Sequence, residues 1–231
     1  MIKLIQSSIR NGCAALLIVL ALFLLVEPAI GLSATTATSQ FTISQTVSAE
    51  VSFLTPASNV ILTTSGGSTS LGGITGGTSN GGTQVAVVTN DRAGYTMTIM
   101  ASSSLGMIGN ASSSQYIPAY VSTTPGVPDY TFAVPPRAYF GYTVEASTTA
   151  DTAQAFKDNG STCNTGSGNT SDSCWLAATS TQYTIINRNY LTPGSGATTT
   201  LKFRVVITPN PNPVIPDDTY VATTTLTATV N

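Results

Sequence analysis

Hydrophobic and polar residues alternate along several stretches of this 231-residue chain. The first stretch covers 41–53, where mostly apolar side chains occupy odd positions and Thr, Ser or Glu occupy even positions. A period of two places successive side chains on opposite faces, so we expect one long, half-buried β-strand over 41–53. The apolar residues that carry this prediction are Phe41, Ile43, Val47, Val51 and Phe53.

A second pattern, at 84–101, is the clearest local motif in the chain. Two apolar or alternating runs, 84–89 and 95–101, flank the turn-forming sequence Asn90-Asp-Arg-Ala-Gly94. Such a pair predicts a β-hairpin. The glycine-rich stretch 65–82 predicts a loop, or weak strands around Leu71 and Ile74. Further strands are expected at 140–146, within 175–186, and at 199–207 and 220–230.

No convincing helical stripe follows residue 31. Strands separated by polar turns predict an all-β fold, specifically an antiparallel, Ig-like β-sandwich. We expect a polar lead-in over 32–37 and one elaborated sandwich domain over 38–231.

The N-terminus has the pattern of an export signal. Lys3 and Arg10 precede an apolar run that extends from Cys13 to Val26. As a helix this run spans about 21 Å, which is shorter than a bilayer core, so a signal peptide over 1–31 is favoured over a retained membrane anchor. Ala29 and Gly31 suit cleavage before Leu32. Either alternative predicts a secreted or cell-surface protein that meets the membrane only through this segment.

Composition excludes several functions. Charged residues make up 8% of the chain, the net charge is −2, and there is no histidine. Nucleic-acid binding requires clustered cations, and catalysis or metal binding by histidine is impossible. A serine nucleophile would need Lys157 or Lys202 as its base, and neither lies in a recognisable motif. No spacing brings two carboxylates together. We therefore expect no enzymatic activity and no cofactor.

Cys163 and Cys174 enclose a segment without apolar residues. In an exported chain such a pair predicts a disulfide that closes a surface loop.

Oxygen donors are concentrated in the same region, where four side chains are weak candidates for a calcium site: Asp151, Asp158, Asn159 and Asp172. The alternative is a set of solvated turns. Glycosylation patterns begin at Asn110, Asn159 and Asn169, and chance matches are expected in a chain so rich in Ser and Thr. Trp175 is expected to be buried in preference to stacking on a sugar.

Two segments resemble exported bacterial surface proteins. The run Val-Val-Thr-Asn-Asp-Arg-Ala-Gly-Tyr-Thr-Met-Thr-Ile, ending at Ile99, and the final strand after Asp217-Asp-Thr-Tyr resemble elements of spore coat protein U-like and pilin-type Ig-like modules. The chain lacks the early cysteine that many such modules carry. The resemblance implies a structural or adhesive surface subunit and carries over no catalytic residues.

The expected function is therefore a non-enzymatic, secreted or cell-surface structural or adhesive subunit. Its 41–53 strand could be the first strand of its own sandwich, or it could pair with another copy or another envelope protein. The alternative function is a carbohydrate- or calcium-dependent extracellular binding module.

Overall fold

The computed structural model describes residues 38–231, so the predicted signal peptide lies outside the described residues. The chain divides into two compact units, 1–46 and 47–231, and every strand of the described residues lies in the second unit. Helical structure within 38–231 is limited to two 3-10 turns, η1 (Thr149–Asp151) and η2 (Gln154–Phe156). The prediction of an all-β fold with antiparallel sheets is confirmed. No helix within 38–231 has the length and apolar character needed to cross a membrane.

The largest sheet has four strands in the order β1 (Val51–Thr55), β2 (Gly77–Thr89), β8 (Ala197–Ile207) and β6 (Ala138–Ala146). Burial alternates along β8 as its sequence predicts. Its odd-numbered side chains, such as Leu201 and Val205, are buried, whereas its even-numbered side chains point to the opposite, outer face. The outer face of β2 and β8 therefore carries most of their solvated polar side chains, such as Asn80, Gln84 and Lys202.

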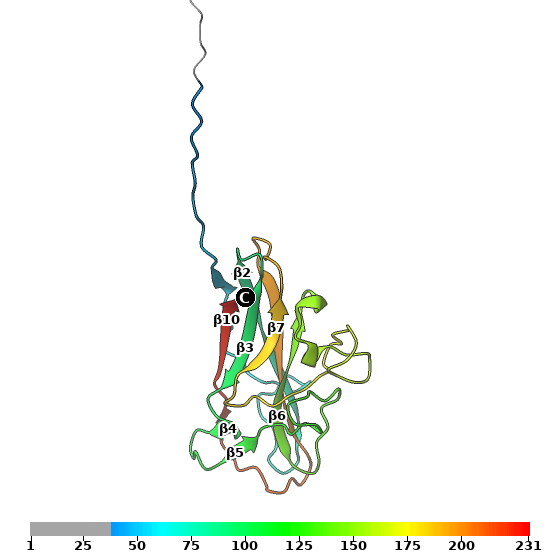
Figure 1. The fold of residues 1–231 in the computed structure, drawn as a ribbon. Coiled ribbons are helices and arrows are strands. Elements are labelled where there is room, and N and C mark those ends of the chain that lie inside the picture. The colour runs from blue at the N-terminus through cyan, green and yellow to red at the C-terminus, as the bar shows by residue number, and fades with distance from the viewer. Residues whose placement is uncertain (1–37) are drawn as a thin grey trace, which may run out of the picture. The chain divides into compact units, whose positions relative to one another are not determined.

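A second sheet has three strands in the order β10 (Thr224–Val230), β3 (Tyr95–Ala101) and β7 (Tyr183–Arg188). In Figure 1 these strands lie side by side, with β3 in the middle. A smaller sheet, β5 (Tyr116–Pro118), β4 (Gly106–Gly109) and β9 (Tyr220–Val221), lies at the end of the 47–231 unit opposite the start of β1.

The predicted hairpin over 84–101 was wrong in one respect. Both strands exist, but β2 pairs with β1 and β8, while β3 pairs with β10 and β7. The Asn90–Gly94 turn therefore carries the chain from one sheet to the other. Gly94 makes this possible because its φ is +84° and an added Cβ would lie 2.1 Å from the carbonyl oxygen of Arg188.

One hydrophobic core joins the two larger sheets. Its fully buried side chains come from strands of both sheets and include Val85, Val87, Met97, Ile99, Val144, Ile185 and Leu201. Tyr120, Tyr139 and Trp175 form a second, smaller cluster. Since Tyr139 alternates with the core residue Phe140 along β6, this cluster covers part of the outer face of the four-stranded sheet.

Several strand boundaries differ from the predictions. The expected final strand over 220–230 is two strands, β9 and β10, which belong to different sheets. The first strand begins at Val51 and not at Phe41, because residues 38–50 form no strand. The prediction that 65–82 is a loop was wrong for its last part, since β2 already begins at Gly77. Partners on both sides overcome the low strand propensity of glycine there, because β8 pairs along one edge and Thr63 pairs with Asn80 on the other.

The face of β10 and β3 that points away from the core is rich in threonine. Thr225, Thr227 and Thr229 alternate along β10 and are exposed. Thr227 lies directly opposite Thr98 of β3, and Thr229 lies opposite Thr96. Cross-strand threonine pairs thus form neighbouring rows of hydroxyl and methyl groups on this face.

Candidate functional site

Asp151, one of the calcium candidates, is committed to a buried ion pair. Its carboxylate accepts a hydrogen bond from the guanidinium group of Arg188, and both side chains are almost fully buried. The Tyr190 hydroxyl donates to the other carboxylate oxygen at 2.9 Å, and the Tyr190 ring lies 3.8 Å from the Arg188 guanidinium carbon. This carboxylate supports the fold through Arg188 and Tyr190 instead of facing a metal site.

Asp158 and Asn159 organise turns beside the disulfide-closed loop. The buried Asp158 carboxylate accepts hydrogen bonds from the Thr170 amide at 2.7 Å, the Thr170 hydroxyl at 2.8 Å and the Gly160 amide at 2.8 Å. Burial alone would raise the pKa of Asp158, but these bonds outweigh it and the pKa lies below its ordinary value. Asn159 accepts hydrogen bonds from the amides of Ser161 and Thr162 in the same way.

The fourth calcium candidate, Asp172, forms an ion pair with Lys202. The structure therefore gives each of the four residues a separate partner set. Between residues 38 and 231, no group of three or more His, Cys, Asp or Glu side chains is placed to bind a metal ion.

Cys163 and Cys174 form the predicted disulfide, with their Cα atoms 5.7 Å apart. Both side chains are buried at the edge of the main core. The segment after Cys174 continues the bonding network, since the backbone amides of Cys174 and Trp175 donate to the carbonyl groups of Tyr130 and Asp129. The disulfide thus fixes the loop that carries Asp172, and Trp175 follows this loop directly.

Trp175 is 1% exposed, as the sequence predicts. Its indole N–H donates to the Asp172 carbonyl at 2.9 Å, and the Arg204 guanidinium lies 4.2 Å from its ring centroid. The ring of Phe132 meets it edge-on at 5.3 Å. No open indole face is left on which a sugar ring could stack.

The three glycosylation patterns differ in accessibility. Asn110 and Asn159 are exposed. The side-chain amide of Asn169 points inward and donates to the carbonyl groups of Val144 and Phe156. Asn169 therefore has a structural role and its nitrogen is not free for glycan attachment.

The residues of the predicted assembly strand fall into two groups. Val51 and Phe53 are half-buried in β1. Phe41, Ile43 and Val47 lie in the N-terminal segment, residues 38–50, and are 81%, 84% and 77% exposed. Asn90 binds the end of this segment, because it accepts from the Glu50 amide at 2.7 Å and donates to the Ser48 carbonyl at 2.9 Å.

An unpaired sheet edge is the second feature relevant to assembly. β10 is the terminal strand of its sheet, and among the described residues it pairs only with β3. Leu226, Ala228 and Val230 line its inward face and are only half-buried. An edge of this kind exposes unpaired backbone amide and carbonyl groups along its whole length.

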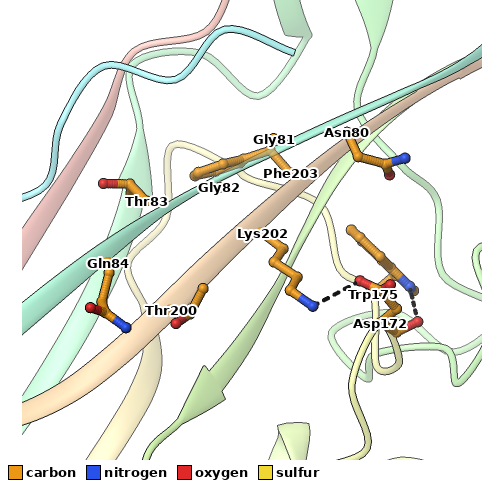
Figure 2. Close-up of a pocket in the computed structure, with 10 residues that line it drawn as sticks. All are labelled: Asn80, Gly81, Gly82, Thr83, Gln84, Asp172, Trp175, Thr200, Lys202 and Phe203. Carbon is orange, nitrogen blue, oxygen red and sulfur yellow. Dashed lines mark hydrogen bonds and ion pairs between the residues drawn. The ribbon is translucent and has the colours of Figure 1, made fainter. Parts of the chain in front are cut away.

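A groove of about 580 Å³ lies on the outer face of the four-stranded sheet. We call it the outer-face groove, and Figure 2 shows the residues that line it. They are Asn80, Gly81, Gly82, Thr83 and Gln84 of β2, Thr200, Lys202 and Phe203 of β8, Asp172 of the disulfide loop, and Trp175 just after this loop. The β-sheet register places Gln84 beside Thr200 and Gly82 beside Lys202. Three segments that are distant in sequence therefore contribute polar groups to one surface.

The charged side chains in and beside the outer-face groove already have partners. The Lys202 ammonium lies 2.8 Å from a Glu145 carboxylate oxygen and 3.2 Å from one of Asp172. Burial alone would lower the pKa of Lys202, but its bonds to these two carboxylates raise it. At the other end, Arg204 donates to the Asn80 side-chain oxygen at 2.7 Å.

Lys202 also donates to the Ser171 hydroxyl at 2.9 Å, which is the one feature suggestive of nucleophilic catalysis. A lysine acts as a general base only when it is neutral. Because the raised pKa keeps Lys202 protonated, this contact does not activate Ser171. Lys157, the other candidate base, donates to the backbone carbonyl of Ala150.

Comparison with known proteins gives no relative, since no family model, no curated protein and no solved structure matches the chain.

Proposed function

We propose that this chain is a non-enzymatic structural or adhesive subunit, secreted or displayed at the cell surface, with one Ig-like β-sandwich domain over 38–231. The pattern of residues 1–31 supports export through a cleaved signal peptide. The observation that carries the proposal is the N-terminal segment, which exposes Phe41, Ile43 and Val47 in an uncharged stretch of alternating residues. Large apolar side chains exposed in such a pattern fit a segment that becomes a strand on binding.

The partner is a second copy of this chain, and the receiving edge is β10. Pairing there would satisfy the backbone groups of β10 and would place Phe41, Ile43 and Val47 near the half-buried Leu226, Ala228 and Val230. Full burial of each large apolar side chain contributes about 1.5–3 kcal/mol, before the cost of ordering the segment is subtracted. Repetition of this head-to-tail contact would produce a linear assembly.

The test is sedimentation of the protein without residues 1–31 over a range of concentrations. We expect concentration-dependent oligomers that dissociate when Phe41, Ile43 and Val47 are all replaced by Ser. A matched variant carries Ala at Thr42, Ser44 and Thr46, on the opposite face of the same segment, and should still associate. Backbone hydrogen exchange along β10 should be slower in the oligomer than in the Ser variant. A protein that is monomeric at high concentration would contradict the proposal.

A further inference from the structure

We propose that the outer-face groove binds a neutral, hydroxyl-rich ligand, that is, a segment of an uncharged glycan chain. This inference goes beyond the proposed structural role, because it assigns a ligand site to a surface that does not include the N-terminal segment or β10. Its volume of about 580 Å³ falls within the ordinary range for ligand sites.

The first argument is that the outer-face groove has unused hydrogen-bonding groups. Among the described residues, none donates to or accepts from the Gln84 amide group, the Thr200 hydroxyl, the Asn80 side-chain nitrogen or the second carboxylate oxygen of Asp172. Amide, hydroxyl and carboxylate groups together can both donate to and accept from sugar hydroxyls. These groups lie at opposite ends of the outer-face groove, so a ligand of more than one sugar unit fits them best (Figure 2).

The second argument is that the positions of the lining residues are fixed. Lys202 is turned toward Asp172 (Figure 2) and also forms an ion pair with Glu145. Its cross-strand neighbour Gly82 has no side chain to fill the outer-face groove. Asp172 is held by Lys202 and by the loop that the Cys163–Cys174 disulfide closes. A site that is already ordered loses little entropy when a ligand binds.

The third argument concerns the class of ligand. An anion would find Lys202 already paired with two carboxylates and Arg204 bonded to Asn80 and placed over the Trp175 ring. A cation would find the carboxylates of Asp172 and Glu145 already shared with Lys202. An apolar ligand would leave amide and hydroxyl groups without partners. A neutral polyol satisfies the groups that are present. Because Arg204 covers the face of Trp175, strong ring stacking is missing and affinity in the millimolar range is expected.

The experiment uses the one tryptophan of the chain as a reporter. Its indole N–H bonds to the Asp172 carbonyl in the wall of the outer-face groove, so its NMR signal should shift when a ligand binds. The protein without residues 1–31 is titrated up to about 10 mM with cellohexaose, maltohexaose and chitohexaose, which would nearly saturate a site with a millimolar Kd. Polygalacturonate oligomers and inorganic phosphate serve as the anionic arms.

We expect at least one neutral hexasaccharide to shift the Trp175 indole and the Gln84 side-chain amide signals. Gln84→Ala and Thr200→Val should each weaken binding about fivefold, since each removes a hydrogen bond. Thr225→Val and Thr227→Val, on the outer face of the other sheet, are matched controls and should leave binding unchanged. Failure of all three neutral sugars, preference for the anions, or binding that survives both groove variants would each overturn the inference. The sedimentation result is independent of all these outcomes.

Discussion

Among the ion pairs of residues 38–231, the buried Arg188–Asp151 pair should lose the most stability when one charge is removed. Asp151→Ala would leave the Arg188 guanidinium buried without its carboxylate and the Tyr190 hydroxyl without its acceptor. We expect the free energy of unfolding to fall by about 3–5 kcal/mol, measured by urea denaturation at pH 7. Asp217→Ala is the control, because Asp217 is exposed, and should change stability by less than about 0.5 kcal/mol. Equal effects of the two variants would contradict this assignment.

The same cluster determines the state of a buried phenol. Tyr95 is fully buried in β3, and burial together with the nearby Asp151 carboxylate raises its pKa to about 12. Tyr95 is therefore neutral at every pH at which the protein is expected to work. Its hydroxyl has no hydrogen-bond partner among the described residues, and nothing in the structure explains this.

Two carboxylates, those of Asp158 and Glu145, should make the free energy of unfolding depend on pH. The pKa of Asp158 is below its ordinary value of 3.8, and that of Glu145 is below 4.5, because hydrogen bonds and, for Glu145, the Lys202 ammonium outweigh the effect of burial. Their stabilising contribution is complete above these ordinary values and is lost as the pH falls through the lower pKa values of the folded protein. We expect the urea midpoint to be constant near neutrality and to fall below about pH 4.5.

The variant Asp158→Asn separates this effect from general acid unfolding. At pH 7 it should cost about 1–2 kcal/mol, because the bonds from Thr170 and Gly160 would reach a weaker, uncharged acceptor. The difference from the unchanged protein should shrink as the pH falls below about 3.8 and then through the lowered pKa of folded Asp158, because Asp158 becomes uncharged only when it is protonated. A constant difference across the pH range would show that Asp158 is not the titrating group.

At the scale of elements, removal of the Cys163–Cys174 disulfide should have a large and measurable effect on stability. Replacing Cys163 and Cys174 by Ser should lower the free energy of unfolding by about 3 kcal/mol, as expected for closing a short loop. Because Trp175 directly follows Cys174, the emission maximum of Trp175 should shift to longer wavelength in the variant. The β signal in far-ultraviolet circular dichroism should be kept. An unchanged emission maximum would mean that the loop does not need the disulfide to cover the indole.

Strands were predictable from the sequence, but their partners were not. Alternation located β3, β8 and β10 because one face of each is more buried than the other, and it located β6 although both faces of that strand are covered. The Asn90–Gly94 turn suggested a hairpin, yet local turn residues do not determine whether the chain returns to the same sheet. The short strands β4 and β5 gave no periodic signal, since three or four residues are too few to define a period, and β9 was predicted only as the start of one strand with β10.

The candidate site likewise has features that the sequence predicted and features that it did not. The disulfide and the burial of Trp175 followed from composition and residue type, and the exposed apolar residues of the N-terminal segment were singled out as an assembly candidate. The outer-face groove was not predictable, because it depends on the register that places Gln84 beside Thr200. The polar even-numbered positions of β2 and β8 were the only available signal, and they resemble any solvated strand face.

At the scale of the whole molecule, the shared core predicts cooperative unfolding. Side chains from both larger sheets form one cluster, so neither sheet buries its apolar face alone. We expect a single thermal transition for the protein without residues 1–31, with the same midpoint by far-ultraviolet circular dichroism and by Trp175 fluorescence. Two separated midpoints would show that the smaller cluster around Trp175 and Tyr120 unfolds independently of the main core.

The threonine rows on β3 and β10 make the outer face of these strands insensitive to the salt concentration. Thr96, Thr98, Thr227 and Thr229 offer hydroxyl and methyl groups and carry no charge. Dissolved electrolyte acts on surfaces mainly by screening fixed charges, and here there are none to screen. Crowded copies could therefore place these faces together at low or high ionic strength without like charges meeting across the contact. Hydration and shape would then govern the fit of the two faces.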